Sequence, residues 1–90
     1  MARKNERTVV VQPEFLADLR EWLKIDRKTA VRVLDLMDAI LRDPFAGVGK
    51  PEPLKHMLSG CWSRRITQEH RLVYVVTDRE VQFLQARYHY

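Results

Sequence analysis

The second half of the chain carries side chains that could perform acid–base chemistry. The candidates are a carboxylate, three imidazoles and several arginines: Glu52, His56, His70, His89, Arg64, Arg65, Arg71 and Arg87. Ser59 and Ser63 lack the neighbouring groups that serine nucleophiles require. The histidine spacing fits no metal-binding motif, so we expect no metal and no cofactor. Gly47 and Gly49 are not followed by the Gly-Lys-Ser/Thr of a phosphate loop.

Cleavage of RNA through its own 2′-hydroxyl needs residue types of this kind. A base takes the hydroxyl proton, cations stabilise charge on the phosphate oxygens, and an acid protonates the leaving 5′-oxygen. Carboxylate, guanidinium and imidazole can supply these roles near neutral pH, and the terminal Tyr90 could stack on a base. The bland alternatives are a solvated carboxylate in a loop, and arginines that merely border a sheet. Composition and spacing alone therefore indicate a basic α+β domain that could bind RNA.

Composition supports an anionic partner. The chain of 90 residues has 16 basic and 12 acidic side chains, a net charge of +4 and a pI near 9.6. The residues from Arg42 onward carry most of the excess, with eight basic against five acidic side chains. Apolar runs are too short for a membrane span or a secretory signal, and the single Cys61 excludes an internal disulfide. We expect one cytoplasmic domain, residues 1–90.

Local signals predict the order β-α-α-β-β-β, an α+β fold. Thr8–Val11 is β-branched and precedes Pro13, which predicts a first strand, at an edge or beginning a sheet. A helix starts at Pro13 and a second one, capped by Asp26, ends near Asp43 before Pro44. Residues 44–55 are predicted as a loop, and strands follow at 62–67, 70–77 and 81–88. We expect a twisted, mostly antiparallel sheet with both helices on one face.

Two further expectations concern the core. The apolar residues of each helix fall at helical spacing: Phe15, Leu16, Leu19, Trp22 and Leu23 in the first, and Ala30, Val33, Leu34, Met37, Ile40 and Leu41 in the second. The run from Leu72 to Val76 is apolar without alternation, which predicts a strand covered on both faces.

Long motifs closely resemble the YoeB/Txe toxins of the RelE-like superfamily. They are Gly49-Lys50-Pro51-Glu52-Pro53-Leu54-Lys55-His56, Leu58-Ser59-Gly60, Trp62-Ser63-Arg64-Arg65-Ile66-Thr67, Glu69-His70-Arg71-Leu72-Val73-Tyr74 and Arg87-Tyr88-His89-Tyr90. The likeness runs from Pro44 to Asp78, resumes at the C-terminus and covers about half the chain. Cys61, where relatives often have an aromatic residue, departs from the pattern.

The resemblance implies the toxin of a type II toxin–antitoxin system, a ribosome-dependent endoribonuclease that cuts mRNA in the ribosomal A site. Glu52 would be the general base, Arg71 would stabilise the phosphate, and His89 would be the acid. Tyr90 would position the substrate base, while Lys55 and Arg65 would hold phosphates. The implied partners are the 70S ribosome, a Phd/YefM-type antitoxin and a second copy of the chain. The alternative is a non-catalytic module that binds the ribosome or the antitoxin.

Overall fold

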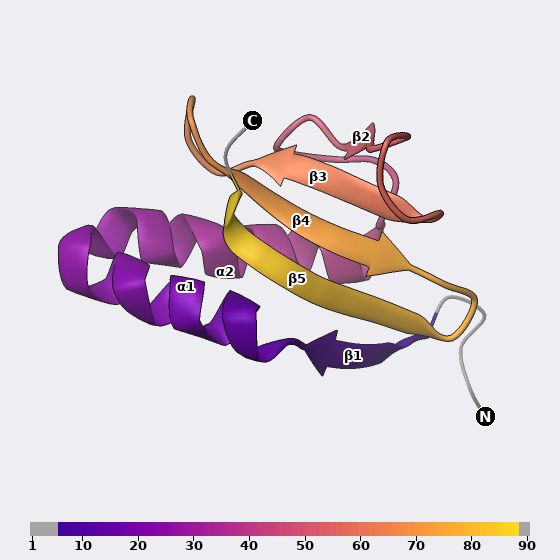
Figure 1. The fold of residues 1–90 in the computed structure, drawn as a ribbon, viewed down its shortest axis with the longest axis horizontal. Coiled ribbons are helices and arrows are strands. Elements are labelled where there is room, and N and C mark those ends of the chain that lie inside the picture. Colours follow the sequence, from indigo (N-terminus) through magenta and orange to yellow (C-terminus); the bar gives the residue numbers. More distant parts are fainter. Residues whose placement is uncertain (1–5, 89–90) are drawn as a thin grey trace.

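Five strands form one mixed sheet in the order β1-β5-β4-β3-β2 (Figure 1). The structure, a computed structural model, describes residues 6–88. Its elements are β1 (Thr8–Val11), α1 (Pro13–Ile25), α2 (Arg27–Arg42), β2 (Glu52–Pro53), β3 (Cys61–Arg65), β4 (Arg71–Val76) and β5 (Glu80–Tyr88). Only β1 pairs in parallel, with β5, and the other neighbours are antiparallel. The expected α+β fold and the edge position of the first strand are thus confirmed.

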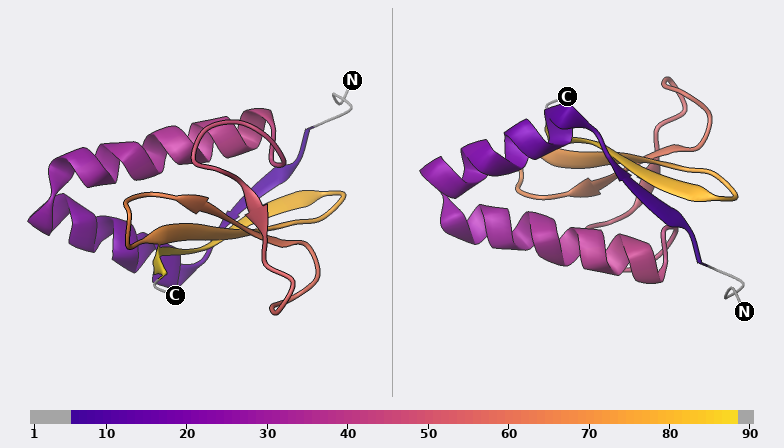
Figure 2. Two further views of the ribbon diagram at one scale, coloured as in Figure 1. Left: turned by 90° about the horizontal axis from the view of Figure 1, so that it is seen from above. Right: turned by 90° about the horizontal axis from the view of Figure 1, so that it is seen from below.

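The predicted helix boundaries are confirmed together with their causes. Pro13 lies in the first turn of α1, where its missing N–H leaves no hydrogen bond unmade. Asp26 caps α2, because its carboxylate accepts from the Thr29 amide at 3.3 Å and from the Thr29 hydroxyl at 2.8 Å. The two helices form an antiparallel hairpin whose closed end projects beyond the sheet (Figures 1 and 2). Among the described residues, no helix is long and apolar enough to cross a membrane.

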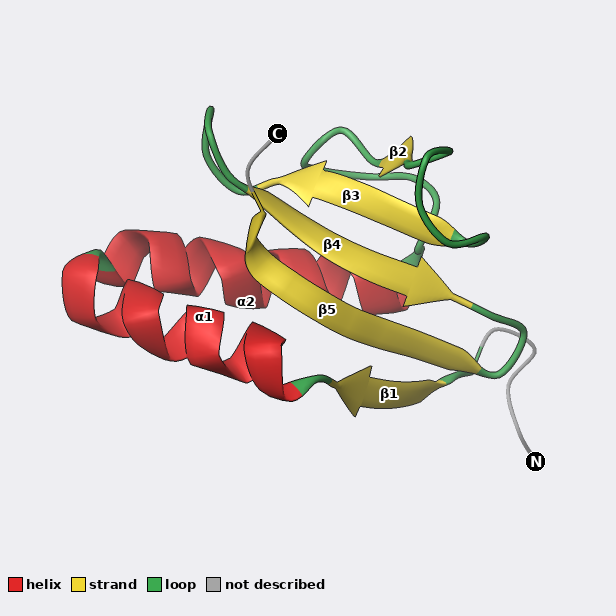
Figure 3. Ribbon diagram, viewed as in Figure 1, coloured by secondary structure: helices red, strands yellow, loops and turns green. Residues whose placement is uncertain are grey.

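One prediction about the loop at residues 44–55 is wrong. Glu52 and Pro53 form the short edge strand β2, which pairs antiparallel with β3 inside an otherwise irregular segment (Figure 3). The three prolines and two glycines of this segment predict irregular structure, and the strand forms only because distant residues of β3 pair with it. The three later strands are confirmed, with ends that differ from the prediction by one or two residues.

The helices bury a narrower stripe than their apolar pattern predicts. Phe15, Trp22, Ala30, Val33 and Ile40 are in the core as expected, and Leu19 and Met37 pack partly against it. The predicted core residues Leu16, Leu23, Leu34 and Leu41 are instead 42–46% exposed, and Leu36 is fully buried. Each helix turns 100° per residue, so a neighbour of a core position lies on the flank when only one face is covered.

Strand β4 is buried on both faces, as its apolar run predicts. Leu72 and Tyr74 pack into the core beneath the helices. Val73 and Val75 pack on the other face with Leu54 and Cys61. The segment after β2 covers this part of the second face through Leu54 and Met57. The remainder of the face is where the candidate site lies.

Candidate active site

Strand pairing brings the predicted site residues to one end of the sheet. Glu52 on β2 lies opposite Ser63 on β3, and Arg65 on β3 lies opposite Arg71 on β4. Arg71 in turn lies opposite Tyr88 on β5. Residues directly opposite each other share a face of a sheet, and successive residues alternate faces. Glu52, Ser63, Arg65 and Arg71 therefore lie on the face opposite the helices.

Arg71 is the centre of this group. Its Nη1 atom lies 3.6 Å from Oε1 of Glu52 and donates a hydrogen bond of 3.3 Å to the Ser63 hydroxyl. The Arg71 side chain is 17% exposed, whereas that of Glu52 is 52% exposed. The largely buried guanidinium of Arg71 on β4 thus contacts the accessible carboxylate of Glu52 on β2, which lies on the far side of β3. This places a proton acceptor and a phosphate-binding cation side by side.

Arg65 adds a second guanidinium on the same face. It is exposed, and it lies directly opposite Arg71 in the β3–β4 pairing. Like charges directly opposite each other destabilise a sheet. Planar guanidinium groups can bind a phosphate in pairs of hydrogen bonds. The two arginines therefore suit an anion that lies across β3 and β4.

The remaining predicted site residues are placed only in part. Lys55 is exposed in the turn after β2, three residues from Glu52. His89 and Tyr90 lie outside the described residues, but Tyr88, which precedes them, is opposite Arg71. Their predicted roles stay predictions. Within residues 6–88, no three His, Cys, Asp or Glu side chains form a group that could hold a metal ion.

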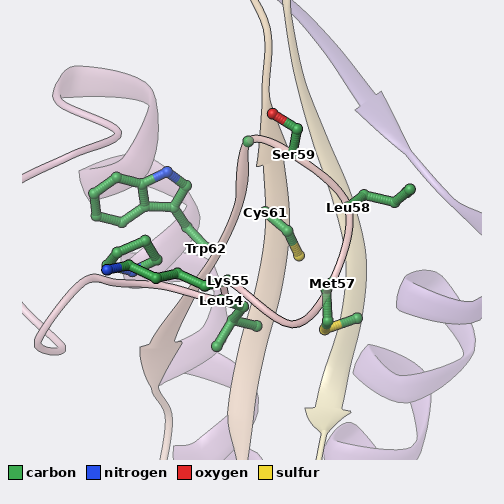
Figure 4. A pocket seen from close by; sticks show the side chains of 9 residues that line it. Leu54, Lys55, Met57, Leu58, Ser59, Cys61 and Trp62 are labelled. Atoms are coloured by element: carbon green, nitrogen blue, oxygen red, sulfur yellow. The ribbon is translucent and has the colours of Figure 1, made fainter.

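A pocket of about 400 Å³ lies next to β2, and Pro53 is part of its lining. It lies within the segment that runs from Pro53 to Trp62, and the side chains of Leu54, Met57 and Cys61 surround it (Figure 4). Burial raises the pKa of the Cys61 thiol, so the sulfur remains protonated and apolar. Lys55 and Ser59 also line the pocket, so its wall combines apolar and polar side chains.

Two residues have roles that the sequence did not indicate: Ser63 was set aside as a nucleophile, and Arg64 was grouped with the candidate phosphate-binding arginines. Ser63 is fully buried and fixes Arg71, although it was predicted to have no supporting context. Arg64 is also fully buried and points the opposite way from its neighbour Arg65. The alternation of residues along β3 is the signal for both, once the strand is known to begin at Cys61.

Comparison with known proteins identifies the chain. Residues 11–90 match the family described as "YoeB-like toxin of bacterial type II toxin-antitoxin system". The chain belongs to this family. A "Toxin YoeB" of Mycobacterium bovis is 57% identical over 84 residues, which cover 93% of this chain and 99% of the relative.

Solved structures of YoeB proteins have the same fold. The structure titled "The structure of YoeB dimer from Staphylococcus aureus" aligns with a TM-score of 0.84 at 36% identity, covering 93% of this chain and 98% of that one. A heterotetrameric YoeB–YefM toxin–antitoxin complex from the same organism aligns with a TM-score of 0.79 at 36% identity, covering 94% and 99%. The YoeB-like chain described here is therefore the toxin of a type II toxin–antitoxin system.

Proposed function

We propose that this YoeB-like toxin is a ribosome-dependent endoribonuclease that cuts mRNA in the ribosomal A site without a metal ion. The observation that carries the proposal is the contact of 3.6 Å between Arg71 and Glu52, with Arg65 directly opposite Arg71. A base next to two phosphate-binding groups is the arrangement that attack by a 2′-hydroxyl requires.

The reaction divides its proton transfers between two residues. Glu52 takes the proton of the 2′-hydroxyl, and the 2′-oxygen forms a bond to phosphorus. Arg71 and Arg65 stabilise the negative charge that grows on the non-bridging oxygens. The bond from phosphorus to the 5′-oxygen breaks, and His89 gives that oxygen a proton. The products are a 2′,3′-cyclic phosphate and a free 5′-hydroxyl.

Two observations support the roles of the C-terminal residues. The pairing of Tyr88 with Arg71 brings the end of β5 next to the phosphate-binding group. His89 and Tyr90 are the first and second residues after Tyr88 in the sequence. His89 serves as the acid, and Tyr90 positions the substrate base. Lys55, exposed near Glu52, holds a neighbouring phosphate.

The partners follow from the family. The Staphylococcus aureus structures show a YoeB dimer and a YoeB–YefM heterotetramer. We propose that this toxin likewise pairs with a Phd/YefM-type antitoxin, whose tail covers the site, and that it forms homodimers. The 70S ribosome supplies the mRNA and is the third partner.

Cleavage of mRNA on purified ribosomes tests the catalytic proposal. Wild-type toxin is expected to cut the message, and Glu52→Gln, Arg71→Ala and His89→Ala are expected to lower the rate by about 10²–10⁴-fold each. Arg79→Ala, a change in the exposed turn before β5, is the matched control and should leave the rate unchanged. Full activity in all three variants would contradict the assigned chemistry.

Mapping of mRNA 5′ ends after induction separates cleavage from a non-catalytic mode of action. A nuclease creates new 5′ ends within codons that occupy the A site. A module that only binds the ribosome or the antitoxin arrests translation and leaves the message intact. Growth arrest without new 5′ ends would therefore replace the proposed function with the non-catalytic one.

A further inference from the structure

Arg64 places a charged side chain in the hydrophobic core. It is 0% exposed, and a buried charge is costly unless hydrogen bonds compensate for it. Its guanidinium donates to the carbonyl oxygens of three residues in the segment after α2: Asp43, Ala46 and Val48. Its Nε atom also lies 3.2 Å from the Tyr74 hydroxyl oxygen. Arg64 therefore ties residues 43–48, which we call the clamp loop, to strands β3 and β4.

Tyr74 extends the same network. Its hydroxyl accepts from Arg64 and donates to the Pro44 carbonyl at 2.7 Å, so the two side chains hold four carbonyls between them. Burial raises the pKa of Tyr74, which keeps the hydroxyl protonated as this donation requires. A guanidinium has five N–H donors in a rigid plane, and no other side chain could span these acceptors.

Three residues in and directly after the clamp loop have positive φ angles. Gly47, Gly49 and Lys50 have φ angles of 121°, 86° and 53°. The backbone also approaches closely: a Cβ atom at Gly49 would lie 2.9 Å from Leu36 and 3.1 Å from the Arg64 Cβ. Glycine adopts a positive φ without strain, whereas the positive φ of Lys50 persists only where surrounding contacts impose it. Arg64 holds the chain two residues before Lys50, through the Val48 carbonyl.

The clamp loop leads directly to the proposed catalytic base. Gly49, which follows it, accepts a hydrogen bond of 2.7 Å from the Arg65 amide, and Glu52 comes three residues later. Glu52 lies on a strand of only two residues, which has little hydrogen bonding of its own. The path of the chain before Glu52 therefore helps to set where its carboxylate lies relative to Arg71, together with the pairing of β2 with β3.

We propose that Arg64 is a positioning residue for RNA cleavage: from the helix face of β3 it fixes the clamp loop and so sets Glu52 against Arg71 on the other face. This inference rests on the proposed function. Arg64 touches neither Glu52 nor the open face, so it acts through the backbone and not on the substrate. Misplacement of a catalytic group by about 1 Å can cost 10²-fold in rate.

The test compares cleavage rates on ribosomes with Arg64→Ala, which removes the guanidinium and leaves its carbonyl partners in place. The rate at saturating toxin should fall by about 10²-fold, while the toxin concentration for half-maximal rate changes by less than about threefold. Added guanidinium at millimolar concentration should restore part of the activity of Arg64→Ala, and equimolar potassium chloride should not. Glu52→Gln should not respond to guanidinium.

Two further variants separate positioning from general stability. Tyr74→Phe removes one hydroxyl from the network, keeps the ring and should lower the rate in the same direction. Phe15→Leu removes the aromatic ring of α1 that packs against Phe83 in the core. It should leave the cleavage rate of the folded protein unchanged. Hydrogen exchange should speed up for amides of the clamp loop in Arg64→Ala and Tyr74→Phe, but not in Phe15→Leu.

The outcomes distinguish this inference from the proposed function. If wild-type toxin does not cleave, the proposed function fails. If wild type cleaves and folded Arg64→Ala cleaves equally fast, the positioning role alone is wrong. If Arg64→Ala does not fold, Tyr74→Phe decides: an unchanged rate overturns the inference, and a lower rate with faster exchange in the clamp loop supports it.

Discussion

Arg65 and Arg71 face each other across β3 and β4, an arrangement that weakens the sheet in the absence of an anion. Glu52 and Ser63 satisfy part of the guanidinium of Arg71. Arg65 is exposed, and within residues 6–88 its hydrogen bonds involve its backbone: its amide donates to Gly49 and its carbonyl accepts from Arg32. We therefore expect the exposed guanidinium of Arg65 to contribute to anion binding rather than to stability.

Arg65→Gln is therefore expected to raise the free energy of unfolding by a few tenths of a kcal/mol, because it removes a like-charge pair. The same change should lower the cleavage rate on ribosomes. Urea denaturation measures the first effect and a cleavage assay the second. Arg65→Lys, which keeps the charge, is the control and should not be stabilised. A loss of stability in Arg65→Gln would mean that the opposed charges are not a net cost.

At the scale of elements, α1 supports the last residues of β5 where strand pairing with β1 has ended. The Trp22 indole donates to the Ala86 carbonyl at 2.7 Å, and Asp18 accepts from the Ala86 amide at 2.9 Å. Trp22 also meets the His70 ring edge-on at 5.0 Å, beside the first residue of β4. A helix therefore replaces a neighbouring strand at the point where β5 approaches the site.

Trp22→Phe keeps an aromatic ring in the core and leaves the Ala86 carbonyl without its donor. An unsatisfied buried polar group costs about 1–3 kcal/mol, so the free energy of unfolding should fall by about that amount. The cleavage rate should fall too, since the end of β5 precedes His89. Urea denaturation and cleavage assays check both. Asp18→Asn retains an oxygen acceptor and should have a smaller effect on each; an equal loss would argue against the specific role of these hydrogen bonds.

The cap of α2 gives a prediction about pH. Hydrogen bonds from the Thr29 hydroxyl and amide lower the pKa of Asp26 below its ordinary value of 3.8. A carboxylate with a lowered pKa stabilises the fold above its unfolded pKa, and the benefit is lost as the pH falls through the folded pKa. Urea midpoints should therefore drop below about pH 4. Asp26→Asn, which also caps helices well, should show a shallower drop in this range; an unchanged drop would exclude Asp26 as a contributor.

At the scale of the whole molecule, the sheet lies between the main hydrophobic core and the candidate site. Both helices and the larger core lie on one face, and the candidate site occupies the open part of the other. Substrate can therefore reach Glu52, Arg65 and Arg71 without displacing a helix. The net charge of +4 and the basic second half favour an approach to a polyanion such as the ribosome.

Binding to ribosomes should consequently weaken as salt rises, with the logarithm of the affinity falling linearly with the logarithm of the salt concentration. Lys55→Gln should reduce that slope by about one, because it removes the proposed phosphate contact. Arg79→Gln, in the turn before β5, should leave the slope unchanged. Equilibrium binding at several salt concentrations checks the prediction. Affinity that does not depend on salt would exclude phosphate contacts as its main source.

The sequence alone determined the features that have local causes. Pro13 begins α1, Asp26 caps α2, and the unbroken apolar run of β4 marks a strand covered on both faces. The long motifs identified the family and the candidate residues, of which Glu52, Arg65 and Arg71 lie together in the structure. Backbone preferences and side-chain periodicity act over a few residues, so they can be read without knowledge of the fold.

Only the tertiary structure decided what depends on long-range pairing. The register of β2, β3 and β4 brings Glu52 to Arg71, although 18 intervening residues separate them in the sequence. Arg64 and Arg65 are neighbours of the same type, yet the pleat of β3 buries one in the core and exposes the other at the site. The physical reason is that each side chain's role follows from the face of the sheet it occupies, and strand pairing alone fixes that face.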